Sequence, residues 1–77
     1  MTADEMFEEL GYEFYLGSPE TLSYHNVKID NCILFWIKDK RVEVYWETIS
    51  NCYRSVPIDM PLLNAINLKC KELGWIE

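Results

Sequence analysis

Two neighbouring segments near the middle of the chain constrain the fold more than any other part of the sequence. Residues 32–38 form a run that is apolar on both faces of an extended chain, which is typical of a central strand. Residues 41–48 alternate strictly between apolar and polar sides, as a half-buried antiparallel strand does. The sequence therefore predicts an antiparallel sheet with one continuous apolar face.

The two ends of the chain have the periodicity of amphipathic helices. Thr2 and Glu5 form a capping box, and Gly11 is placed to end the helix that it begins. Asp59 is a second helix cap, and Gly74 a second helix end. The apolar stripes of the two helices are expected to consist of Ala3, Met6, Phe7 and Leu10 in the first, and Leu62, Ile66, Cys70 and Leu73 in the second, with Leu63 at its margin.

Turn residues divide the region between these helices into extended segments. We expect strands over residues 12–16, 21–29, 32–38 and 41–48, and a weaker strand over 52–56 after a turn at Asn51. The whole chain of 77 residues is long enough for one domain only. The predicted fold is α+β: an antiparallel three- to four-stranded meander with the N-terminal and C-terminal helices packed on one face, a two-layer sandwich.

The register of the central hairpin decides which residues share a face. If Asp39-Lys40 is a two-residue hairpin loop, the core face pairs Ile37 with Val42, Phe35 with Val44, and Ile33 with Trp46. The opposite face then carries Cys32 and a group of aromatic and aliphatic residues with an acidic rim: Leu34, Trp36 and Tyr45, with Glu43 and Glu47. Two short helices do not easily cover both faces, so this group is expected to form an exposed patch typical of protein interaction sites. The alternative is that residues 12–16 or a loop fold over it.

The charge of the chain is concentrated at its start. Residues 1–20 contain six acidic residues and no Lys or Arg, whereas residues 21–77 contain seven of each sign, so the first quarter accounts for the net charge of −6. Within the first helix, Asp4, Glu5, Glu8 and Glu9 form an acidic face. It is either a solvated surface or a docking site for a basic partner. Such a charge balance argues against direct binding to a nucleic-acid backbone or an anionic membrane.

Few residues in the sequence are suited to catalysis or metal binding. His25 is the one histidine, and Cys32, Cys52 and Cys70 are widely spaced, which favours buried free thiols over a disulfide framework or a zinc site. No nucleotide, metal or nucleophile motif is present, so we expect no catalytic residue and no cofactor. The longest apolar run is too short to cross a bilayer and no secretory signal begins the chain, which favours a cytoplasmic location.

The two terminal segments resemble those of a known group of proteins. Residues 1–13, MTADEMFEELGYE, and 65–77, AINLKCKELGWIE, are similar to small uncharacterised proteins of prophages and integrative elements in Gram-positive bacteria. The resemblance implies a cytoplasmic accessory protein of a mobile element and implies no catalytic residues.

Three hypotheses about function follow. The first is a non-enzymatic interaction module that acts through the Leu34, Trp36 and Tyr45 face, either on a host protein or as a homodimer. The second is an acidic inhibitor that imitates nucleic acid. It would occupy the nucleic-acid groove of a host DNA-processing or defence protein through the first helix. The third is a small metal-binding protein or enzyme that uses His25 and cysteine, for which the sequence offers least support.

Overall fold

The chain folds into a five-stranded sheet with one helix before it and one after it. The computed structural model describes residues 1–47 and 53–77. The elements in chain order are α1 (Ala3–Glu9), β1 (Glu13–Gly17), β2 (Thr21–Asn26), β3 (Asn31–Trp36), β4 (Arg41–Glu47), β5 (Tyr53–Ser55) and α2 (Met60–Glu72).

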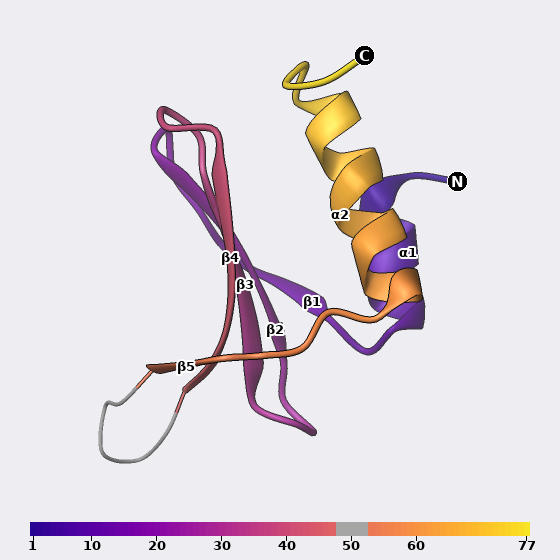
Figure 1. The fold of residues 1–77 in the computed structure, drawn as a ribbon, viewed down its shortest axis with the longest axis vertical. Helices are drawn as coiled ribbons and strands as arrows, with labels where there is room; N and C mark the ends of the chain where they lie inside the picture. The colour runs from indigo at the N-terminus through magenta and orange to yellow at the C-terminus, as the bar shows by residue number, and fades with distance from the viewer. Residues whose placement is uncertain (48–52) are drawn as a thin grey trace.

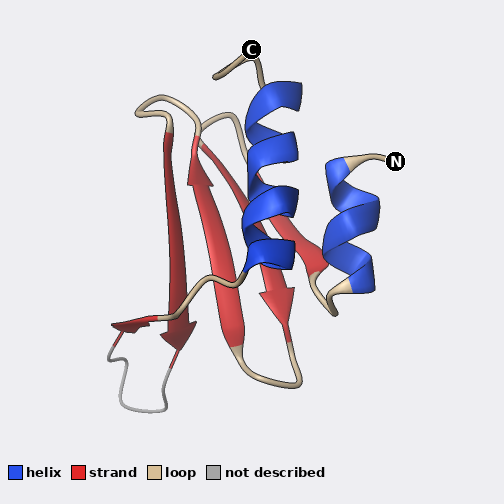
Figure 2. Cartoon of the chain, turned by 45° about the vertical axis from the view of Figure 1, so that its right-hand side comes forward, coloured by secondary structure: helices blue, strands red, loops and turns tan. Residues whose placement is uncertain are grey.

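The sheet is an antiparallel meander in which the strand order is the chain order, β1-β2-β3-β4-β5. Both helices lie side by side on the same face of this sheet, and no described element lies on its other face (Figures 1 and 2). This arrangement confirms the predicted two-layer α+β fold, with the short strand β5 as a fifth member. We call the face under the helices the inner face and the uncovered one the outer face.

Aromatic side chains on the inner face join the helices to the sheet. Phe7 of α1 and Tyr24 of β2 are fully buried, with ring centroids 4.5 Å apart. Phe35 of β3 is also fully buried and lies 6.2 Å from the ring of Trp75, which follows α2. Such ring pairs bury large apolar areas, so they supply much of the driving force that holds the two layers together.

The two helices end in the same way, at a glycine followed by an aromatic residue. Gly11 and Gly74 have positive φ angles of 93° and 78°. The amide of Tyr12 donates to the Phe7 carbonyl, and the amide of Trp75 donates to the Cys70 carbonyl, each at 2.9 Å. These are Schellman motifs, in which the residue after the glycine packs back against the helix. Both predicted helix ends are confirmed, as are the capping box of Thr2 with Glu5 and the cap at Asp59.

The predicted two-residue hairpin between β3 and β4 is wrong. Its loop has four residues, 37–40, and the register pairs Phe35 with Val42 and Ile33 with Val44. The predicted pairs Ile37–Val42, Phe35–Val44 and Ile33–Trp46 therefore do not form. A tight two-residue turn needs positive φ at its central residues, and here only Lys40 has one, at 53°. Because the shift is two residues, every side chain keeps its predicted face.

Several other sequence predictions have different bounds in the structure. The strand predicted over 21–29 ends at Asn26, and residues 27–30 form the loop that was expected at Asp30-Asn31. In α2, Ala65 is fully buried whereas Cys70 and Leu73 are only partly buried. Thr48, the Asn51 turn and Cys52 lie outside the described residues.

Candidate interaction surface

The outer face holds an apolar hollow at the residues that the sequence analysis placed there. Leu34, Trp36, Glu43 and Tyr45 line an open depression of about 400 Å³. We call Leu34, Trp36 and Tyr45 the aromatic patch. All three side chains are half-buried, and Cys32 beside them is buried. The patch is therefore a shallow recess in the sheet surface and not a set of protruding side chains.

The indole of Trp36 is held in place by two charged neighbours. Its Nε1 donates a hydrogen bond of 2.7 Å to Glu43 Oε1, and the Arg41 guanidinium lies 5.5 Å from the ring centroid. Arg41 Nε is in turn 3.5 Å from the same Glu43 oxygen. A tryptophan whose polar group already has a partner presents an apolar surface in a fixed orientation, which lowers the entropic cost of binding.

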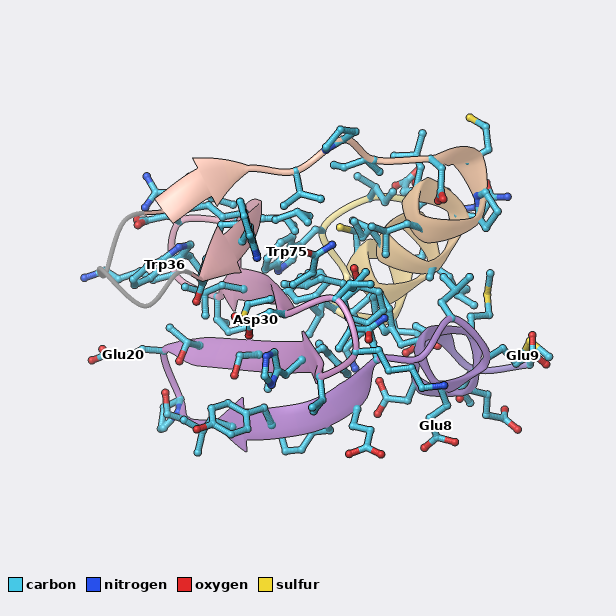
Figure 3. The ribbon with its side chains drawn as sticks, turned by 90° about the horizontal axis from the view of Figure 1, so that it is seen from below. Glu8, Glu9, Glu20, Asp30, Trp36 and Trp75 are labelled. Atoms are coloured by element: carbon cyan, nitrogen blue, oxygen red, sulfur yellow. The ribbon has the colours of Figure 1, made fainter. Side chains whose placement is uncertain are left out.

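The segment that was expected as an alternative cover for the patch lies elsewhere. Tyr12 is buried in the inner-face core, and β1 extends the sheet at its edge by pairing with β2. Figure 3 shows Trp36 on the side of the sheet away from the helices, whereas Trp75 lies toward them. Within residues 1–47 and 53–77, no segment folds over the aromatic patch. Glu47 is the last residue of β4 and pairs with Tyr53. The side chain of Glu47 is not among those that the structure describes.

The acidic face expected on α1 is divided by internal contacts. Asp4 Oδ1 accepts a 2.6 Å hydrogen bond from the hydroxyl of Tyr24 and lies 3.2 Å from Lys69 Nζ of α2. Burial, followed by this bond to Asp4, raises the pKa of Tyr24 well above its usual value. Asp4 therefore links α1 to the sheet and to α2, which is a structural role.

The other three acidic residues of α1 do not form one surface. Glu5 Oε1 accepts from the Thr2 amide at 2.8 Å, and the hydrogen bonds with Thr2 lower the pKa of this carboxyl. Glu8 borders a hollow beside β1, whereas Glu9 borders a different one beside Pro61. Figure 3 shows their side chains pointing in different directions. A partner would thus meet Glu8 and Glu9 from different sides.

His25 has a neighbour that the sequence did not suggest. It pairs directly across the sheet with Cys32, and its Nε2 lies 3.1 Å from Asp30 Oδ1. Cys32 is only 8% exposed, so its thiol offers little access to a substrate. No group of three or more metal-ligating side chains occurs among the described residues. The helices in the described ranges are also too short or too polar to cross a membrane.

The structure adds one exposed apolar segment that the sequence analysis did not single out. Phe14, Tyr15 and Leu16 of β1 are 55%, 64% and 61% exposed. A β-bulge at Tyr15 interrupts the register, because Phe14 pairs with Tyr24 and Leu16 with Ser23. The bulge places Tyr15 and Leu16 together on the outer face, while Phe14 stays on the inner face with its ring over Gly17. An edge position cannot be recognised from residue alternation alone.

Comparison with known proteins found no relative of this chain. No protein-family model matches the chain, and neither a curated protein nor a solved structure shows significant similarity to it.

Proposed function

We propose that the chain is a non-enzymatic protein-interaction domain whose binding surface is the aromatic patch on the outer face. The observation that carries this proposal is the placement of both helices on the inner face, which leaves an apolar recess of about 400 Å³ open around Leu34, Trp36 and Tyr45. Half-buried aromatic residues around a preformed recess are the usual anchors of protein interfaces.

A second copy of the chain is the occupant that this surface favours. The rim of the patch carries charges of both signs, Arg41 and Glu43, two positions apart on β4. Under two-fold symmetry each charge can face its opposite on the other copy, so the surface is self-complementary. Two sheets packed face to face would also enlarge the core of a small domain, which gains stability from association.

The acidic-inhibitor hypothesis receives less support from the geometry. Two of its four residues, Asp4 and Glu5, are engaged in hydrogen bonds within the chain. The resemblance to proteins of mobile elements remains a hypothesis, and an accessory role of that kind is compatible with an interaction domain.

The test of the proposed function is the solution mass of a Leu34→Lys variant. Leu34 lies directly across from Glu43, so a lysine there gains an opposite charge as its cross-strand partner and the fold is expected to tolerate it. The new charge would stand in the middle of the aromatic patch. Val27 is 74% exposed in the turn between β2 and β3, so Val27→Lys changes the net charge by the same amount and is the matched control.

A further inference from the structure

We propose that the free edge of β1 binds an extended segment of another protein as an added strand, and that this segment is apolar in its middle and carries Lys or Arg at both ends. This site lies on another strand than the aromatic patch, although Leu16 and Leu34 both pair with Ser23 of β2, and it does not depend on the proposed function. Strand addition of this kind takes its affinity from backbone hydrogen bonds and its specificity from side chains on alternate positions.

The edge of β1 is only partly protected against pairing with other strands. Among the described strands, β1 is an outer strand of the sheet and pairs with β2 alone. Edge strands are usually shortened, carry lysine or proline, or contain a β-bulge, to prevent pairing with other chains, and β1 has the bulge at Tyr15. The opposite edge strand, β5, has three residues, whereas β1 has five and contains neither lysine nor proline.

An apolar surface lies along this edge. Phe14, Tyr15 and Leu16 are each more than half exposed, although large apolar side chains are costly to leave in water. Phe14 lies on the inner side of the edge and the other two on the outer side. An added strand would therefore find apolar contacts for side chains on both of its faces.

The hydroxyl of Ser23 restrains the backbone at the bulge through hydrogen bonds. The amide of Leu16 donates to Ser23 Oγ at 3.2 Å, and the same hydroxyl donates to the Leu16 carbonyl at 3.4 Å. These bonds satisfy the polar groups that the bulge removes from the regular ladder. The edge is thus preorganised and loses little entropy when a strand is added.

Charge identifies the chemistry of the partner segment. Glu8 and Glu13 border an open hollow of about 680 Å³ next to Phe14, which Lys28 also lines. Glu20 is exposed in the turn that follows β1, and Figure 3 shows Glu8 and Glu20 toward opposite ends of the β1–β2 hairpin. Acidic residues at both ends favour a segment with basic ends and repel an acidic one.

The same charges argue against a second copy at this edge. Residues 1–27 contain six acidic residues and no Lys or Arg, so two copies paired at β1 would bring like charges together. In addition, a stable dimer interface buries about 800 Å² on each partner, more than one five-residue edge offers. A short extended segment is the occupant that fits in both size and charge.

A pair of synthetic peptides tests the proposal on the intact chain. The probe is Lys-Lys-Val-Tyr-Val-Phe-Val-Lys-Lys, and the matched control has glutamate in place of the four lysines. Binding is measured by titration of the isotope-labelled protein and followed through the amide signals of β1. We expect the basic peptide to shift the signals of Glu13–Gly17 and to bind at least about tenfold more tightly than the acidic one.

Variants of the protein show which surface binds. The double variant Tyr15→Lys with Leu16→Lys is expected to weaken peptide binding by about tenfold or more. Its matched control, Val27→Lys with Ile29→Lys, makes the same change of charge in an exposed turn. The affinity of this control for the basic peptide should be closer to that of the wild type. Leu34→Lys should also leave the peptide-induced shifts at β1 unchanged. A failure of the strand-addition proposal is then distinguishable from a failure of the proposed function of the aromatic patch.

Three results of the peptide titrations would overturn the inference. They are equal binding of the two peptides, no binding of the basic peptide, and binding that the Tyr15 and Leu16 double variant does not weaken. Dimerisation of the wild-type chain that this double variant abolishes but Leu34→Lys leaves intact would also overturn it, because the occupant of the edge would then be a second copy.

Discussion

The hydroxyl of Tyr24, on strand β2, donates a 2.6 Å hydrogen bond to the carboxylate of Asp4 on α1. Lys69 of α2 lies 3.2 Å from the same carboxylate and 5.8 Å from the centre of the Tyr24 ring. One polar group thus joins β2 and both helices on the inner face. This contact therefore helps the buried aromatic pairs to hold both helices on the inner face.

Removing the hydroxyl is expected to destabilise the fold. Tyr24→Phe keeps the buried ring but loses the bond to Asp4, and hydrogen bonds to charged groups contribute about 1.5–3 kcal/mol. Asp4 is about half exposed and keeps Lys69, so a loss of about 1–2 kcal/mol in the free energy of unfolding is expected. Urea unfolding measures this loss in the free energy of unfolding. Tyr15→Phe, at an exposed tyrosine, is the matched control, and an equal loss in both variants would contradict this role.

The two helix-ending glycines should differ in their response to alanine. Both have positive φ, which costs a residue with a Cβ about 1 kcal/mol or more. A Cβ on Gly11 would also lie 3.0 Å from Nδ2 of Asn26, whereas none of the described atoms lies within 4 Å at Gly74. Asn26 cannot move freely, because its side chain donates to the Leu10 carbonyl and accepts from the Lys28 amide.

Gly11→Ala is therefore expected to lower the free energy of unfolding by about 2 kcal/mol, and Gly74→Ala by about 1 kcal/mol. Thermal or urea unfolding of the two variants makes the comparison. Equal losses would mean that Asn26 adapts without cost.

The capping box predicts a dependence of stability on pH. The hydrogen bonds with Thr2 lower the pKa of Glu5 below its ordinary value of 4.5 in the folded chain. The charged carboxylate therefore adds stability above pH 4.5, and this contribution is lost as the pH falls through the folded pKa. Glu5→Gln keeps a capping side chain without the charge, so the wild type should be the more stable at pH 7 and the two should converge in acid. Glu9→Gln, on the same helix, controls for loss of one negative charge.

Local signals in the sequence were sufficient to predict the helices and the faces of the central strands. Thr2, Glu5, Gly11 and Gly74 act through neighbours in the chain, so their roles could be inferred from spacing alone. The aromatic patch was found because strand alternation survives a register shift of two residues. The error in that register arose at Ile37, which belongs to the loop although it continues an apolar run.

Features that depend on distant parts of the chain could not be predicted. Asp4 meets Lys69 across 65 positions, and no spacing rule connects them. The internal partner of Asp4 removes it from the acidic surface that composition alone had suggested. The exposed edge at Tyr15 and Leu16 results from a bulge and from the position of β1 in the strand order, which are tertiary properties.

The most direct test of the proposed interaction surface is the solution mass by light scattering over a concentration series. The measurement compares the wild-type chain with Leu34→Lys and Val27→Lys, each first shown to be folded by its near-ultraviolet circular dichroism. We expect the mass of the wild type and of Val27→Lys to rise with concentration from that of one 9.2 kDa chain to that of two, while Leu34→Lys stays at one. A wild-type chain that stays monomeric at every concentration, or a Leu34→Lys variant that dimerises equally well, would contradict self-association through the aromatic patch.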